Sequence, residues 1–168
     1  MPDEAPHCVE VVGKEAVGNE VMRVDLPYDM RKRSRLRATS RCGREIGIQL
    51  PRGTELLHGQ RLLGEGGEQV EIVASEETVS TVSAKSQLLL LKAAYHLGNR
   101  HVPLQVTENW LRYQHDHVLD DMVVGLGLNV SVEQAPFQPE SGAYHRHSDS
   151  ASDSHGHGSH PQAHIHGQ

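Results

Sequence analysis

Histidine is the residue type whose number and spacing in this chain most directly suggest chemistry. Of the 13 histidines, seven lie in the last 24 of the 168 residues, most of them in His-x-His pairs. Neutral imidazole is a ligand for nickel, copper, zinc and cobalt, and two rings one residue apart can close on one ion. The pattern therefore predicts transition-metal binding without choosing the metal. The residues concerned are His145, His147, His155, His157, His160, His164 and His166.

The segment that carries these histidines, residues 145–168, is rich in His, Ser, Gly and Asp, and Ile165 is its only large aliphatic residue. Because so few apolar side chains cannot offset the entropy of ordering the chain, we expect a disordered, His-rich tail. An expression tag would place its histidines consecutively, whereas here other residues separate them. We interpret the segment as a native metal-binding tail, with a plain solubilising tail as the alternative.

Of the six remaining histidines, four lie between residues 96 and 117, in a part of the chain that is expected to fold. His96 falls near the end of a predicted helix and His101 follows the next turn, where a histidine is more often a surface or capping residue than a ligand. His115 and His117 flank Asp116. On an extended segment their rings would point to one face and could share an ion, whereas Asp116 could instead cap a helix beside two exposed histidines. The spacing leaves both interpretations open.

The segment around His115 and His117 gives little support to the interpretation that the protein is an enzyme. Residues 115–120, HDHVLD, resemble the HxHxDH motif of dinuclear metallohydrolases, but Asp120 stands one place late and no histidine follows it. A catalytic zinc site also needs three protein ligands and an open position in a cleft. The motifs HExxH and GxSxG and the P-loop are absent from the sequence. We therefore expect a protein that is not an enzyme.

The elements that must position these residues divide the chain into three parts. Residues 1–75 carry short alternating apolar runs between Gly, Pro and Asn turns, which predicts a small β-barrel or sandwich domain. Residues 76–144 are typical of strand, helix, two strands, helix and strand, with Ser86 and Asp116 as helix caps and residues 102–106 and 110–113 as central strands. This βαββαβ order predicts a ferredoxin-like sheet, and hence an α+β fold class, followed by the tail at 145–168. The second helix is expected to bury Val118, Leu119, Met122, Val123 and Leu126.

Composition and charge exclude several classes of function. The formal net charge of −6 disfavours general nucleic-acid binding. No window approaches the ~18 consecutive apolar residues of a membrane span, and the N-terminus lacks a secretory pattern, so we expect a cytoplasmic protein without membrane contact. Cys8 and Cys42 form no CxxC motif and are interpreted as inert thiols. Seven of the 16 Lys and Arg residues fall within residues 31–44, which we interpret as a docking surface for an acidic partner or a solvated face.

Several longer segments carry a resemblance to a known family. They are YHLGNRHVPLQ at residues 95–105, DHVLDDM at 116–122, PFQPESGAY at 136–144, RKRSR at 31–35 and LPRG at 50–53. Together they resemble the UreE family of urease accessory proteins, which are nickel metallochaperones. The resemblance covers nearly the whole chain, and the first of these segments is specific to the family.

The resemblance implies a homodimer whose protomers combine an N-terminal β domain for partner or peptide contact with a ferredoxin-like domain for metal binding and dimerisation. It places His101 at the two-fold axis and makes His115 and His117 accessory ligands, as in some members of the family. His96 lies inside the signature and is a further candidate ligand. Gln114 stands where the family often has another histidine, which leaves any accessory site without that third ring.

The function implied by the resemblance is delivery of Ni(II) to the urease apoprotein, together with the urease maturation GTPase. Zn(II), Cu(II) and Co(II) would compete for the same ligands, and tail histidines would complete the coordination of the shared ion. The alternative is a general nickel or zinc buffer or storage protein without a specific client. Because imidazole must be neutral to coordinate, binding is expected to weaken as the pH falls through about 6.5.

Overall fold

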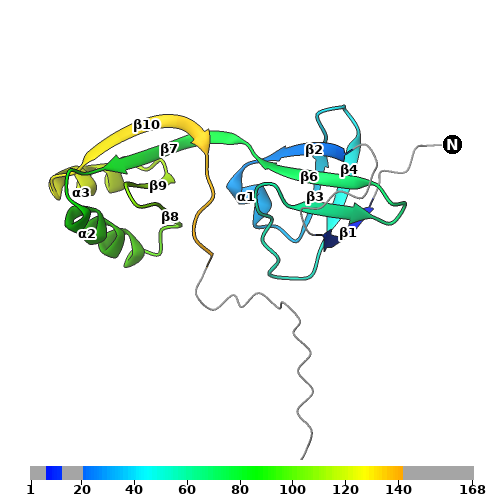
Figure 1. Cartoon of the computed structure of the whole chain (residues 1–168), viewed down its shortest axis with the longest axis horizontal. Helices are drawn as coiled ribbons and strands as arrows, with labels where there is room; N and C mark the ends of the chain where they lie inside the picture. The colour runs from blue at the N-terminus through cyan, green and yellow to red at the C-terminus, as the bar shows by residue number, and fades with distance from the viewer. Residues whose placement is uncertain (1–6, 13–20, 142–168) are drawn as a thin grey trace, which may run out of the picture.

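The computed structural model describes residues 7–12 and 21–141, which build two β-sheets joined by a very short connection (Figure 1). The six-stranded sheet comes first along the chain, and the four-stranded sheet follows with the two longer helices. The last strand of the first sheet ends at Ala74 and the first strand of the second begins at Glu76. One end of the second sheet therefore lies close to the first.

In the strands of the six-stranded sheet between residues 21 and 74, side chains alternate between a more buried and a more exposed face. Met22, Val24 and Leu26 of one strand and Val70 and Ile72 of its neighbour lie in one core. The strand order is β2-β6-β5-β1-β4-β3, with β1–β4 and β2–β6 parallel and the other pairs antiparallel. Its elements are β1 (His7–Val12), β2 (Val21–Leu26), α1 (Tyr28–Arg31), β3 (Arg35–Thr39), β4 (Glu45–Gln49), β5 (Arg61–Gly64) and β6 (Gln69–Ala74).

The predicted barrel or sandwich is wrong for the described residues, whose first six strands form one open sheet. A closed barrel needs a hydrogen-bonded ladder between the edge strands β2 and β3. In the described part of the chain these edges meet instead through a backbone hydrogen bond from Arg41 N to Arg23 O at 2.8 Å and an ion pair between Arg41 and Asp25 at 2.7 Å. An alternating pattern identifies the buried face of each strand but not how the two edges meet, so closure could not be predicted from it.

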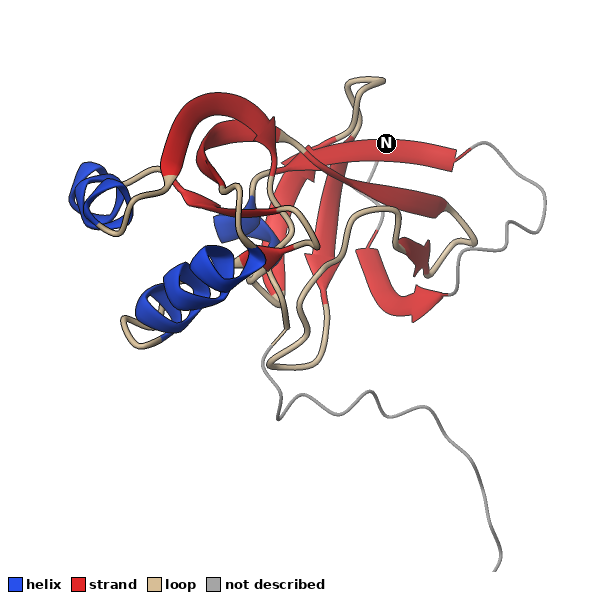
Figure 2. Ribbon diagram, turned by 60° about the vertical axis from the view of Figure 1, so that its left-hand side comes forward, coloured by secondary structure: helices blue, strands red, loops and turns tan. Residues whose placement is uncertain are grey.

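The second sheet has the predicted βαββαβ order. Its strands are arranged β10-β7-β9-β8 and every pair is antiparallel. The helices α2 and α3 cover one face of this sheet (Figure 2). The elements are β7 (Glu76–Ser83), α2 (Gln87–Gly98), β8 (Gln105–Val106), β9 (Trp110–Gln114), α3 (His117–Gly125) and β10 (Asn129–Pro136).

Three local details differ from the sequence-based expectations. The strand expected at residues 102–106 is reduced to Gln105–Val106, because the chain before it is still leaving α2. Ser86 occupies the N-cap position of α2, but its side chain makes no capping hydrogen bond. Val118, expected on the buried side of α3, is 61 % exposed in the first turn, whereas Val123 is fully buried.

No helix within residues 21–141 is long and apolar enough to cross a membrane.

A third, small core joins the two sheets. Tyr28 of α1 packs with Val79, Ala135 and Phe137 from the second sheet and the segment after β10. The rings of Tyr28 and Phe137 meet edge to face, with 5.3 Å between their centroids. The segment after β10 therefore lies between the two sheets rather than extending away from them.

Arg31 is fully buried at the same junction, which corrects its interpretation as part of a docking surface or solvated face. Its guanidinium donates to Leu26 O at 3.2 Å, to Leu56 O at 3.1 Å, to Gln138 Oε1 at 2.7 Å and to Phe137 O. A buried guanidinium must be satisfied by acceptors. These come from β2, from the loop before β5 and from the segment after β10. Arg31 thus connects the two parts of the molecule.

The other residues of the basic run are placed as an alternating strand requires. Arg35 and Arg37 of β3 are exposed, and Arg33 is exposed just before the strand. Because β3 is an edge of the six-stranded sheet, these three cations border one exposed rim.

Candidate metal-binding region

One end of the four-stranded sheet collects the segments that carry the four candidate histidines of the described residues. Gln114, the last residue of β9, lies opposite Val79 near the start of β7, and Pro136, the last residue of β10, lies opposite Glu76. Because β8 runs antiparallel to β9, the loop that leads into β8 lies at this end too. The end of α2, the start of α3 and the exit from β10 therefore lie at the end nearest the six-stranded sheet (Figure 1).

His101 is exposed and lies just after the last turn of α2. Its φ of 57° is in the left-handed region, and it is the only non-glycine residue in the described part of the chain with a positive φ. Its N–H donates to Gly98 O at 2.9 Å, and Val102 N donates to Leu97 O at 3.4 Å, which is how a left-handed residue ends a helix. Glycine is usual at such a position, so backbone strain coincides here with an exposed imidazole.

His115 lies directly after β9, with its ring beside the first turn of α3. Its Nδ1 is 3.1 Å from Ser80 Oγ and 3.1 Å from Asp120 Oδ2, and its N–H donates to Thr78 O at 3.1 Å. The side chain of His115 is 37 % exposed and that of Asp120 is 15 % exposed. Within the described residues Nε2 has no hydrogen-bond partner, so it is the ring nitrogen available to a ligand.

Asp120 is itself held by a buried tyrosine. The hydroxyl of Tyr113 donates to Asp120 Oδ1 at 2.6 Å, and Tyr113 is fully buried in the core under the helices. Burial and the neighbouring Asp120 carboxylate raise the pKa of the Tyr113 phenol. Tyr113 therefore remains a protonated donor at neutral pH.

Asp116 is the N-cap of α3, as one of the two interpretations of the His-Asp-His unit predicted. Its Oδ1 accepts from Val118 N at 2.8 Å and from Leu119 N at 3.3 Å. His117 is the first residue of the helix and is exposed. Because the chain turns from strand to helix between His115 and His117, the pair does not lie on one continuous extended segment.

His96 lies in the last turn of α2 and is half-buried. Its ring stands edge-on to that of Tyr95, with 5.4 Å between the centroids. Its carbonyl accepts a hydrogen bond from Arg100 Nη1 at 3.2 Å, so this residue also contributes to the end of the helix.

The four histidines share one end of the sheet without forming a closed site in one protomer. Within residues 21–141, no three His, Cys, Asp or Glu side chains are grouped so that they could hold a metal ion. The seven tail histidines lie outside the described residues. A closed metal site that uses these histidines would therefore draw further ligands from outside this part of the chain or from another copy of the protein.

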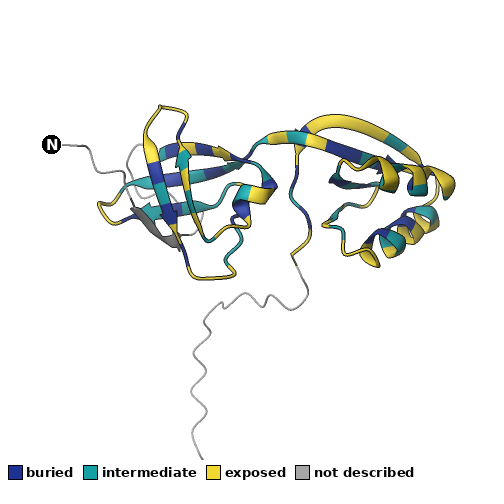
Figure 3. Ribbon diagram, turned by 180° about the vertical axis from the view of Figure 1, so that it is seen from behind, coloured by how far each residue is buried: buried dark blue, intermediate teal, exposed yellow. Residues whose placement is uncertain are grey.

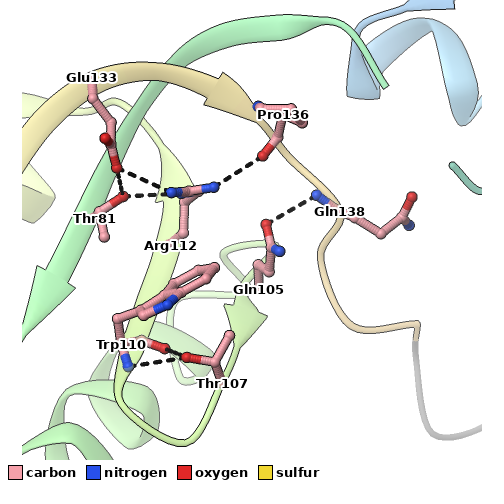
Figure 4. A network of polar contacts seen from close by, with 8 residues as sticks. All are labelled: Thr81, Gln105, Thr107, Trp110, Arg112, Glu133, Pro136 and Gln138. Atoms are coloured by element: carbon pink, nitrogen blue, oxygen red, sulfur yellow. Dashed lines mark hydrogen bonds and ion pairs between the residues drawn. The ribbon is translucent and has the colours of Figure 1, made fainter. Parts of the chain in front are cut away.

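The exit from β10 is fixed next to the loop that carries His101. Gln138 N donates to Gln105 Oε1 at 3.1 Å, as Figure 4 shows, and Glu140 N donates to Leu104 O at 2.9 Å. Leu104 is only three positions from His101. The last described residues before the tail therefore lie beside the candidate metal-binding loop.

Arg112 lies on the face of the sheet opposite to the helices and holds the end of β10 against β7 and β9. Its guanidinium donates to Thr81 Oγ1 at 2.9 Å, to Glu133 Oε1 at 3.0 Å and to Pro136 O at 3.1 Å (Figure 4). It also lies over the ring of Trp110, 4.5 Å from the centroid. Arg112 thus joins β7, β9 and the end of β10.

The polar group around His115 was not found by sequence reasoning. The sequence places Asp120 in the displaced hydrolase pattern and in the family segment at 116–122, and it identifies Tyr113 and Ser80 only as strand residues. A usable signal exists, because Tyr113 and His115 share one face by the two-residue period of a strand, and Asp120 falls in the first turn of the capped helix. Which of these side chains touch depends on how α3 packs against the sheet.

Cys42 lies outside this region, in the turn after β3. Its thiol is exposed and 3.1 Å from Ser40 Oγ. The hydrogen bonds from Ser40 and from the backbone of Arg44 lower the pKa of this thiol.

Family models match both parts of the chain. Residues 10–75 match the model described as UreE urease accessory protein, N-terminal domain. Residues 77–166 match the model described as UreE urease accessory protein, C-terminal domain. The two matches leave only short segments of the chain uncovered.

Relatives named urease accessory protein UreE are similar over most of their length. One from Saccharophagus degradans is 50 % identical over 138 residues, which are 81 % of this chain and 82 % of the relative. One from Vibrio parahaemolyticus is 56 % identical over 134 residues, or 80 % of this chain and 84 % of the relative. One from Pseudomonas putida strain W619 is 58 % identical over 123 residues, or 72 % and 76 % of the two chains.

Proposed function

Because the chain belongs to the UreE family of urease accessory proteins, we propose that it is a metallochaperone that carries Ni(II) and delivers it to the urease apoprotein. It works in the cytoplasm as a homodimer, together with the urease maturation GTPase, and has no catalytic role of its own. The observation that carries this proposal is the position of the exposed His101 beside the origin of a histidine-rich tail.

The homodimer is supported by an apolar stripe on α2. Leu88, Leu91 and Tyr95 are three and four positions apart, hence on one face of the helix, and they are 61 %, 63 % and 66 % exposed. In Figure 3 part of the ribbon of this helix has the colour of exposed residues. Large apolar side chains exposed together favour a protein interface. The stripe runs toward the end of α2, where His101 follows.

A two-fold axis near His101 would double the number of imidazoles that one ion can reach. In an isologous interface each residue close to the axis meets its own copy, so two imidazoles approach one point. One exposed imidazole cannot hold a divalent ion tightly, whereas two rings from two protomers form half of a four-coordinate site.

The tail can supply the remaining ligands. A chain spans at most about 3.3–3.6 Å per residue, so the five residues from Glu140 to His145 reach up to about 17 Å. Because Glu140 is bonded to Leu104, His145 and His147 are within reach of His101. Ligands from an exposed loop and a tail exchange readily, which suits an ion that must be handed on.

The central test is Ni(II) binding by the full-length chain, measured by titration calorimetry and native mass spectrometry. His101→Ala should abolish the tightest site, expected at one ion per dimer, while the tail continues to bind ions. His58→Gln, which changes a histidine in the loop between β4 and β5, is the matched control and should leave that site intact. A tightest site that is unchanged in His101→Ala would refute the assignment.

The alternative function, a nickel or zinc buffer without a client, is favoured by the large number of tail histidines alone. Co-purification with the urease maturation GTPase separates the two functions, because only a chaperone needs that partner. In a reconstituted activation assay, the wild-type chain should raise urease activity above the level obtained with the same total Ni(II) alone. Activation equal to that with free Ni(II), together with no bound GTPase, would favour the buffer. A hydrolase screen of the metal-loaded protein should give no turnover.

A further inference from the structure

Four residues form a connected polar group at the edge of the candidate metal-binding region. Tyr113 donates to one carboxylate oxygen of Asp120, and the other oxygen lies 3.1 Å from Nδ1 of His115, which is also 3.1 Å from the hydroxyl of Ser80. The group joins β7, β9 and the first turn of α3. No such contact fixes the ring of His117 within the described residues.

The carboxylate of Asp120 has little freedom to choose another orientation. Its oxygen Oδ1 is occupied by the buried Tyr113 hydroxyl at 2.6 Å, so Oδ2 is directed to His115. Its backbone belongs to the first turn of α3, which the Asp116 side chain caps. The contact with Tyr113 and the first turn of α3 therefore fix the position of the carboxylate, which is not free to rotate as an exposed side chain would be.

This geometry decides which nitrogen of His115 carries the proton. An ionised carboxylate only accepts hydrogen bonds, so Nδ1 of the neutral ring must be the donor and Nε2 keeps its lone pair. A carboxylate bonded to the far nitrogen of a metal-binding histidine also orients the ring and makes it a stronger ligand. Ser80 Oγ can orient its own hydrogen to suit this arrangement.

We infer that Asp120 is a positioning residue that holds His115 in the Nδ1-protonated form and presents its Nε2 to the ion. The inference rests on the proposed metal-binding role of this region, and it makes His115 and His117 unequal. His115 is a pre-oriented ligand, and His117 is a free side chain at the helix start.

The first arm of the test examines the metal-free, full-length protein by nuclear magnetic resonance of the histidine ring nitrogens. The signals of His115 are assigned by their loss in His115→Gln. Wild type should show Nδ1 protonated and Nε2 unprotonated above neutral pH. In Asp120→Asn, Tyr113 still donates to the amide oxygen, so the amide NH₂ faces His115 and the proton should move to Nε2. Asp121→Asn makes the same charge change at an exposed position in the same turn and should leave the tautomer as in wild type.

The second arm follows binding of Zn(II), a diamagnetic stand-in for the cargo ion, through the ring-nitrogen shifts of individual histidines. Asp120→Asn should weaken coordination by His115 about 10–100-fold, while Asp121→Asn should leave it unchanged. Tyr113→Phe keeps the carboxylate but frees its second oxygen, and it should give a smaller loss. A cooperative thermal melt of each variant shows that it folds.

Two results would overturn the inference: a wild-type His115 that is protonated at Nε2 without metal, or unchanged coordination by His115 in Asp120→Asn. Failure of the proposed function has a different signature. If His115→Gln leaves ion binding intact while His101→Ala abolishes the tight site, the positioning inference fails and the chaperone proposal stands. If neither variant changes ion binding, both fail.

Discussion

His101→Gly should raise the stability of the metal-free protein while removing its central ligand. His101 has a φ of 57°, and a side chain in this left-handed region costs about 1–2 kcal/mol that glycine does not incur. Glycine loses more conformational freedom on folding, which offsets about 0.4–1 kcal/mol of that gain. The middle of each range gives a net effect of about 0.8 kcal/mol in favour of glycine.

The matched variant is His101→Ala, which removes the same imidazole but keeps the strained Cβ. Comparing His101→Gly with His101→Ala separates the backbone effect from loss of the ring. For a domain of this size the glycine variant should melt about 2–6 °C above the alanine variant. The melts are followed by circular dichroism in the presence of a chelator and at one protein concentration, because bound ions and dimerisation both shift the melting temperature.

Added nickel should reverse the order of wild type and the glycine variant. At a free Ni(II) concentration about 100 times the dissociation constant, binding to the native state adds about 2.7 kcal/mol, which exceeds the strain at His101. Wild type should then become the more stable protein, while His101→Gly should gain only what the tail sites contribute. If His101→Gly melts no higher than His101→Ala without metal, the strain argument is wrong. If nickel stabilises wild type and His101→Gly equally, His101 is not the ligand.

Three further outcomes follow from the junction and the tail. Arg31→Met should lower the free energy of unfolding by about 2–4 kcal/mol because it leaves acceptors in the N-terminal part of the chain and in the segment after β10 unpaired; urea unfolding checks this against the exposed Arg33→Met, and equal midpoints would contradict it. Burial and the nearby Glu55 raise the pKa of the Tyr28 phenol, so the folded state favours the neutral phenol. The stability that Tyr28 contributes is therefore complete below about pH 10 and declines above that value. Between about pH 9 and 11 the free energy of unfolding should fall less in Tyr28→Phe than in wild type, and an equal fall in the two proteins, measured by urea unfolding, would refute this. Truncation after residue 144 should reduce the number of bound Ni(II) ions without lowering the cooperative melt, since all three described cores are built from residues 22–137; loss of the melt would show that the tail contributes to folding.

Much of the fold could be predicted because its signals are local. The alternating runs marked the strands of the six-stranded sheet, and Asp116 and Gly98 marked the beginning of α3 and the end of α2. Side-chain alternation and capping depend on residues close together in the chain, so a sequence contains them directly. The open edge between β2 and β3 was mispredicted because it depends on residues that are distant in sequence.

The same distinction between local signals and distant contacts applies to the candidate site. The number and spacing of the imidazoles and the family of the chain could all be predicted from the sequence. The packed fold was needed to establish that His101 adopts a left-handed conformation beside the exit from β10, that Asp120 and not His117 is the partner of His115, and that Arg31 is buried. These relations are contacts between helices, strands and loops packed on one another, so no local pattern contains them. A side chain's chemistry is local, but its hydrogen-bond partners and burial are set by what the rest of the chain places around it.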